Sequence, residues 1–176
     1  MRLRSERERK TASFNWTLWL KWILVSTLGW VIGWALTNQF IVGAVVGTVQ
    51  WVVLRPLIRE DGWWIAASAA GWAGSVALVT FLLRPGNPFV GPAIIGIGIG
   101  VVQWLVLRWQ LQRAWWWIVL STLGWGVGLM GVLGASLAGA AAGAVTGVGL
   151  ELLLRHPRPE AWNQERIQSP ETGKGS

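Results

Sequence analysis

Apolar residues fill six long segments of the chain, and short polar or turn-forming runs separate these segments. The segments cover 16–36, 40–54, 62–83, 89–107, 114–130 and 137–154. Crossing the hydrocarbon of a bilayer takes about 20 consecutive apolar residues in a helix. Most of the segments are near that length, and the second is the shortest. The pattern therefore predicts an all-α polytopic membrane bundle of six transmembrane helices.

A nine-residue frame, W-I-x-x-S-x-x-G-W, occurs three times, at 22–30, 64–72 and 117–125. Residues three and four apart lie on one face of a helix, so each copy forms a stripe that is large at one end and small at the other. The glycines of these stripes are Gly29, Gly33, Gly71, Gly124 and Gly128. Small residues let helix backbones approach closely in lipid, so we expect these glycines to lie at helix contacts.

A second frame, G-x-x-x-G-x-x-Q-x-x-x-L-R, alternates with the first. Its glycines are Gly43, Gly47, Gly96, Gly100, Gly143 and Gly147, again predicted at helix contacts. The first two copies carry Gln50 and Gln103, whereas the third is interpreted as having Leu150-Glu151 in place of Gln-Trp. Alternating repeats predict three copies of a helical hairpin, at about 16–55, 62–108 and 114–155. Residues 1–15 form a basic segment before them, and the polar tail at 156–176 is expected to be disordered.

Composition supports a membrane protein and excludes several chemistries. Hydrophobic residues make up 53% of the chain, charged residues only 13%, and there are 23 glycines and 16 tryptophans. The absence of cysteine excludes disulfides, thiol nucleophiles and cysteine-based metal sites. The single histidine, His156, lies in a basic flank, so we expect no metal site and no catalytic triad. We found no catalytic constellation of any kind, and the sequence indicates that the protein is not an enzyme.

The basic residues cluster beside apolar segments, although the net charge of +7 could by itself suggest a nucleic-acid binder. This distribution is typical of membrane topology and of contact with anionic lipid headgroups, so no nucleic-acid partner is expected. Nearly all Lys and Arg residues lie at the termini and in the 55–61 and 108–113 loops, and Arg84 lies on the other side. The positive-inside rule therefore predicts that both termini face the cytoplasm.

Tryptophans near one set of segment ends suggest an aromatic belt at the membrane interface. They are Trp16, Trp19, Trp22, Trp63, Trp64, Trp115, Trp116 and Trp117. Trp30, Trp72 and Trp125 lie deeper, and a belt does not readily explain them.

Three polar residues inside the predicted spans are candidates for function. A buried amide needs hydrogen-bond partners, so Gln50 and Gln103 are expected to bond a frame serine, or the indole N–H of one of the deeper tryptophans, between helices. The alternative is that both amides line a cavity and hold the polar group of a ligand. Glu151 is the one acidic residue inside a predicted span, and an i,i+4 ion pair with Arg155 is the favoured interpretation. A proton or cation site, or a ligand anchor, stays open for Glu151.

The alternating S-x-x-G-W and G-x-x-Q-W-x-x-L-R frames resemble those of uncharacterised Trp- and Gly-rich bacterial integral membrane proteins, which are common in photosynthetic lineages. The resemblance covers about residues 16–155. It implies a bacterial cytoplasmic or thylakoid membrane, and it implies no function.

Two functions follow from these observations as expectations. The first is a non-catalytic scaffold, assembly factor or accessory subunit, with another membrane protein or a second copy as partner. The alternative is a binder or transporter of a small hydrophobic ligand, such as a tetrapyrrole, a carotenoid or a lipid. The ligand site predicted for the alternative contains Gln50, Gln103, Glu151, Trp72, Trp125, Ser68 and Ser121. The sequence indicates no particular cofactor.

Overall fold

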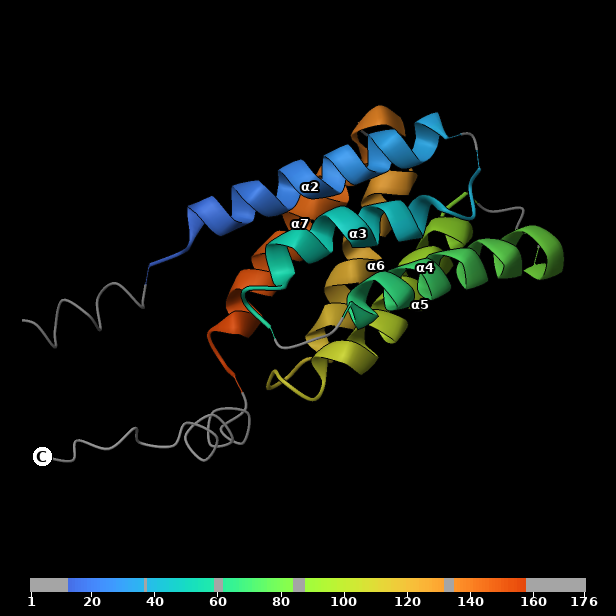
Figure 1. The fold of residues 1–176 in the computed structure, drawn as a ribbon. Coiled ribbons are helices and arrows are strands. Elements are labelled where there is room, and N and C mark those ends of the chain that lie inside the picture. Colours follow the sequence, from blue (N-terminus) through green and yellow to red (C-terminus); the bar gives the residue numbers. More distant parts are fainter. Residues whose placement is uncertain (1–12, 37, 59–61, 84–87, 132–134, 158–176) are drawn as a thin grey trace, which may run out of the picture.

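The computed structural model describes residues 13–36, 38–58, 62–83, 88–131 and 135–157, and this part of the chain is built from helices and turns (Figure 1). It contains six α-helices: α2 (Trp16–Ala35), α3 (Val42–Leu54), α4 (Trp63–Ala77), α5 (Val90–Leu107), α6 (Trp116–Leu129) and α7 (Ala138–Leu154). A π-helical segment, η1 (Leu78–Leu83), continues α4, and a short 3₁₀ turn, η2 (Ala135–Leu137), leads into α7. The predicted all-α fold is confirmed. Arg84, most of the N-terminal segment and most of the C-terminal tail lie outside the described residues.

Among the described residues, three helical segments are long and apolar enough to cross a membrane. They are Trp16–Ala35, Trp63–Leu83 and Val90–Leu107. The helices α3, α6 and α7 are apolar but shorter, with 13, 14 and 17 residues. At a rise of about 1.5 Å per residue, the shortest of them is about 20 Å long. Of the six predicted spans, length and composition therefore support three directly.

The six helices form a closed ring. Each helix packs against its neighbours in the chain, and α7 packs against α2, so the last helix completes the circle (Figure 1). Around the ring, α2, α4 and α6 alternate with α3, α5 and α7. The ends of the ring differ in their connections. At one end, called the terminal end, α2 begins and α7 ends; at the other, called the turn end, α2 turns into α3.

Glycines lie where neighbouring helices approach most closely. A Cβ built on Gly29 would lie 2.7 Å from the Val46 Cα, and one on Gly71 would lie 2.8 Å from the Ile99 Cα. A Cβ built on any of the eleven glycines expected at helix contacts would come within 3.1 Å of an atom on the adjacent helix. At seven of them the approach is under 3.0 Å, so a methyl group would require the neighbouring helix to shift, and at Gly33, Gly100, Gly124 and Gly147 the neighbour would have to yield by a few tenths of an ångström.

Six tryptophans fill the axis of the ring in two layers. The terminal-end triad consists of Trp22, Trp64 and Trp117, with ring centroids 6.1, 6.2 and 5.5 Å apart. The turn-end triad consists of Trp30, Trp72 and Trp125, with centroids 5.7, 5.7 and 5.3 Å apart. All six side chains are buried. Mostly tilted or edge-to-face contacts of this kind are favourable between indole rings.

The triads correct the predicted aromatic belt. Trp22, Trp64 and Trp117 were expected at the membrane interface, but they lie in the core with 0–1% of their surface exposed. Their neighbours in the chain are exposed, as residues of an aromatic belt would be: Trp63 is 68% exposed, and Trp116 is 45% exposed. Trp63 and Trp64 are adjacent in sequence, as are Trp116 and Trp117. In each pair one side chain lies on the outer face of its helix and the other faces the axis of the ring.

Candidate functional site

A buried polar layer lies between the two tryptophan triads. Gln50 on α3 donates from Nε2 to Ser26 Oγ on α2 at 2.9 Å, and its Oε1 accepts the Nε1–H of Trp64 on α4 at 3.2 Å. On α5, two helices further round the ring, the side-chain amide of Gln103 forms the same two kinds of bond. It donates to Ser68 Oγ at 2.8 Å and accepts from Trp117 at 2.8 Å. Each glutamine thus joins the helix before it to the helix after it.

The third junction of this layer contains threonine instead of glutamine. Trp22 Nε1 donates to Thr146 Oγ1 on α7 at 3.0 Å, and the Thr146 hydroxyl donates to the Ala142 carbonyl at 2.6 Å. Threonine has no amide group to reach the serine on the preceding helix. Ser121 Oγ, which is fully buried, consequently has no hydrogen-bond partner among the described residues.

Glycine contacts show that the third copy of the second frame was aligned one helical turn too late. A Cβ on Gly143 would meet Ser26 Cβ at 2.9 Å, as one on Gly47 would meet Ser68 Cβ at 2.6 Å. Gly143 therefore corresponds to Gly47 and not, as predicted from the sequence, to Gly43. In the corrected register Thr146 stands for glutamine, Leu150 matches Leu54 and Leu107, and Glu151 stands where the other copies have arginine.

The error has a physical cause. Gly139, Gly143 and Gly147 follow one another at spacings of four, so α7 offers two overlapping G-x-x-x-G pairs. Either pair could serve as a small-residue contact face, and only the partner helix decides between them. Full burial of Leu54, Leu107 and Leu150 agrees with the corrected alignment.

Glu151 forms the ion pair that its spacing from Arg155 predicted. Arg155 Nη2 lies 2.6 Å and Nε lies 3.0 Å from Glu151 Oε1. The same oxygen accepts the backbone N–H of Asn15 at 3.1 Å. The carboxylate is only 4% exposed, and Oε2 has no partner among the described residues.

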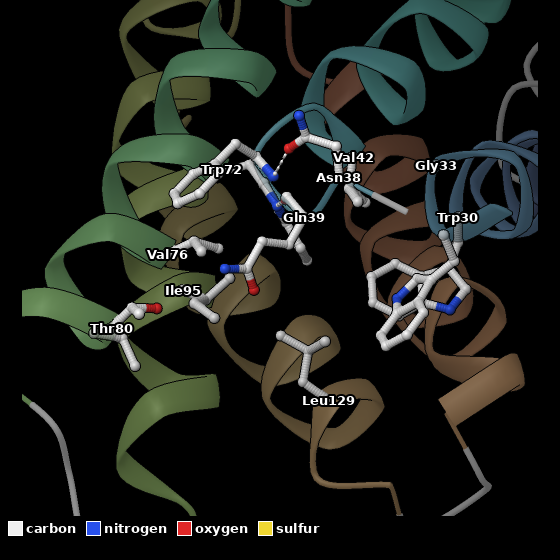
Figure 2. A pocket seen from close by; sticks show the side chains of 13 residues that line it. Trp30, Gly33, Asn38, Gln39, Val42, Trp72, Val76, Thr80, Ile95 and Leu129 are labelled. Atoms are coloured by element: carbon white, nitrogen blue, oxygen red, sulfur yellow. Dashed lines mark hydrogen bonds between the residues drawn. The ribbon is translucent and has the colours of Figure 1, made fainter. Parts of the chain in front are cut away.

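A pocket of about 860 Å³ opens at the turn end, beside the turn-end triad (Figure 2). Its aromatic lining is Trp30, Trp34, Phe40 and Trp72, and its aliphatic lining is Val42, Val76, Val79, Ile95 and Leu129. Gly33, Asn38, Gln39 and Thr80 complete it. Figure 2 shows Trp30 across the pocket from Val76 and Thr80, with Leu129 between the two sides. The volume lies in the range of small-molecule sites, which is about 300–1,000 Å³.

Two local features shape this pocket. Trp72 Nε1 donates to the Gln39 carbonyl at 2.6 Å, which fixes the turn between α2 and α3 against α4. The π-helical η1 places Val79 and Thr80 on the wall. Short π-helical segments occur frequently at functional sites. The lining has three uncharged polar side chains and no charged one, so it suits a neutral and mainly apolar molecule.

The structure does not bring the predicted ligand-site residues around this pocket. Of that set, only Trp72 is among the lining residues. Gln50, Gln103, Ser68 and Ser121 lie in the polar layer, Trp125 lies in the turn-end triad, and Glu151 lies at the terminal end. The two amides bond side chains of neighbouring helices, so the prediction that they line a cavity with Trp72 and Trp125 is corrected. Reasoning from sequence missed Trp30, although its place at the end of the nine-residue frame matches that of Trp72.

Within the described ranges, no three His, Cys, Asp or Glu side chains come together as metal ligands. No protein-family model, no curated protein and no solved structure matches this chain. The resemblance to Trp- and Gly-rich bacterial membrane proteins therefore stays a prediction from the sequence.

Proposed function

We propose that all six helices span a membrane as three copies of one hairpin. The ring supports this, because each shorter helix is packed between two neighbours that include a longer apolar one. Helices packed side by side share the same depth, and the turns at their ends can cover the missing length. Recurrence of the Gln–Ser and Trp–Gln bonds at two junctions supports a common origin of the hairpins. The basic flanks support placing both termini in the cytoplasm, next to anionic lipid headgroups. The resemblance of the repeat frames is the reason for proposing a bacterial membrane.

We infer that the protein is a non-catalytic membrane protein that binds a small, uncharged, apolar ligand at the turn end. The pocket of about 860 Å³ is the observation that carries this proposal. Indole and aliphatic walls favour a conjugated or branched hydrocarbon, and Asn38 or Thr80 could bond one neutral polar end. Among the ligands considered from sequence, a carotenoid or a lipid chain fits this lining better than a tetrapyrrole with ionised carboxylates, because the lining offers no cation.

Because side chains fill the axis of the ring, the structure supports ligand binding better than it supports transport along the axis. Below the pocket the two tryptophan triads and the polar layer between them fill the centre of the ring. A hydrated path would require these six indoles to separate. For the same reason the structure offers no support for an ion channel along the axis.

The test is native mass spectrometry of the protein purified in a mild detergent, with matched variants on α5. Ile95→Trp fills the pocket, while Ile97→Trp places the same side chain at a position that is 45% exposed outside it. We expect the parent and Ile97→Trp to carry a reproducible apolar molecule, and Ile95→Trp to reduce its occupancy about tenfold, which corresponds to about 1.4 kcal/mol. Equal occupancy in both variants, or no bound molecule in the parent, would contradict the proposal.

A scaffold or accessory subunit is the second proposal, and the solid interior favours it. A ring whose axis is packed with side chains is a rigid body with an apolar outer surface. Purification without an apolar molecule but with one fixed membrane partner, or as a defined homo-oligomer, would support this function over ligand binding.

A further inference from the structure

One of the six contacts between neighbouring helices has no covalent connection at either end. At the terminal end, α3 continues into α4 through 55–62, and α5 continues into α6 through 108–115. At the same end, α7 meets α2, but these helices stand at opposite ends of the described chain. The α2–α7 seam is therefore held by non-covalent contacts alone.

Polar contacts concentrate at this seam. Glu151 Oε1 on α7 accepts the Asn15 N–H just before α2, at 3.1 Å. Arg155 Nη2 bonds the same carboxylate oxygen at 2.6 Å and also donates to the Ser13 carbonyl at 3.1 Å. The ion pair thus joins the end of the last helix to two of the residues that lead into the first one, Ser13 and Asn15.

The chain that follows α7 makes a second attachment. Gln112 donates its backbone N–H to the His156 carbonyl at 2.9 Å and its Nε2–H to the Pro157 carbonyl at 3.1 Å. Gln112 lies in the loop between α5 and α6. Residues 151–157 therefore fasten the start of α2 and the α5–α6 loop at the same end of the ring.

The equivalent positions at the other two junctions carry a different chemistry. Arg55 and Arg108 correspond to Glu151, and each guanidinium lies over a tryptophan of its own helix, 5.5 Å from Trp51 and 5.4 Å from Trp104. A covalent loop follows each of these arginines. Acid replaces arginine only at the junction where no loop is present.

We propose that Glu151 and Arg155 form a latch that closes the ring, and that the α2–α7 seam is the one that opens when the latch is broken. The carboxylate is buried, whereas the Arg155 side chain is 29% exposed. Replacing Arg155 therefore leaves a buried charge uncompensated, and replacing Glu151 removes the oxygen that accepts from both Arg155 and the Asn15 N–H. The inference does not depend on the ligand proposed for the turn end.

Single cysteines can report the opening of each seam, since the natural chain has none. Ser26 faces Gly143 in the α2–α7 seam, Ser68 faces Gly47 in the α3–α4 seam, and Ser121 faces Gly100 in the α5–α6 seam. All three serines are buried. Ser26→Cys, Ser68→Cys and Ser121→Cys would each be made with and without Glu151→Gln, and alkylation by a small maleimide would be timed in detergent.

We expect Glu151→Gln to raise the alkylation rate of Ser26→Cys by about tenfold or more, with Ser68→Cys and Ser121→Cys changing little. Arg155→Gln should repeat this result, because it removes the other half of the latch. Arg55→Gln serves as the matched control, since its junction is covalent, and it should leave Ser68→Cys protected. Equal acceleration at all three cysteines, or none at Ser26→Cys with either latch variant, would overturn the proposal. Circular dichroism of each variant separates seam opening from general loss of helix.

Discussion

The two tryptophan triads contain the same residue on the same three helices, yet their surroundings differ. Next to the terminal-end triad lie three fully buried leucines, Leu54, Leu107 and Leu150. The turn-end triad adjoins a pocket of about 860 Å³ to which Trp30 and Trp72 contribute. Identical side chains therefore form closed core at one end and the wall of a candidate site at the other. The residues around each triad, and not the tryptophans themselves, determine whether it is closed core or borders a pocket.

Their indole N–H groups show the same contrast. Trp64 and Trp117 donate to glutamine side chains in the buried layer. Trp72 donates to the carbonyl of Gln39, a residue of an exposed turn. An acceptor that loses its donor in a buried layer stays unpaired, whereas one in an exposed turn can bond water. Three predictions test how far this difference between the ends extends.

The largest effect is expected from emptying the terminal-end triad. Trp64→Ala removes a fully buried ring and leaves a cavity next to Gln50, so we expect the free energy of unfolding to fall by about 3–5 kcal/mol. Trp63→Ala is the control on the same helix, because Trp63 is 68% exposed, and its effect should be within about 0.5 kcal/mol. Unfolding in mixed detergent micelles, followed by circular dichroism, measures both. Similar losses for the two variants would mean that the triad is not the core of the ring.

A smaller loss of stability should distinguish the two triads when the same substitution is made in each. Trp64→Phe and Trp72→Phe make the same chemical change, but the first leaves the buried Gln50 Oε1 without its indole donor. We expect Trp64→Phe to cost about 1–2 kcal/mol more than Trp72→Phe in the same unfolding assay. Trp72→Phe should instead loosen the turn at Gln39 and lower the amount of apolar molecule that purifies with the protein. If Trp72→Phe were the more costly of the two, the turn end would be as closed as the terminal end.

The smallest effect concerns the polar layer between the triads. Ser68→Ala leaves the Gln103 amide without its acceptor, and it should lower stability by about 1 kcal/mol. Ser121→Ala removes a hydroxyl that has no partner in the described structure, so stability should stay within about 0.5 kcal/mol of the parent. Thermal unfolding of the two variants under one detergent condition makes the comparison. A cost at Ser121 equal to that at Ser68 would show that its hydroxyl is bonded after all.

Much of the helical structure could be predicted from local patterns. Each of the six α-helices begins within two residues of the start of its predicted apolar segment. The Glu151–Arg155 ion pair follows from the i,i+4 spacing of the two residues on one helix. The end of α4 was missed, because apolar residues there continue without a break while the backbone changes to a π-helix at Leu78. Periodicity in such a run does not distinguish the two helix types.

The candidate site was less predictable. Buried amides were expected to need partners, and the frame serines that serve them were predicted. The indoles that serve them, Trp64 and Trp117, were expected at the membrane interface instead, and a deep tryptophan was expected in their place. Because both glutamine amides are bonded to serine and tryptophan side chains, neither is available to bind a ligand. The pocket combines residues of α2, α4, α5 and α6 with the turn after α2, and no single segment carries a pattern for it.

By itself, the sequence determined where helices form, which faces carry small residues and which polar groups would need partners. These properties depend on neighbours three and four residues away along one helix. Only the tertiary structure decided that the helices close into a ring, that six tryptophans meet on its axis, and that Thr146 takes the place of glutamine at the third junction. These features depend on which helix stands opposite, and several helix faces here are small enough to pack against more than one partner.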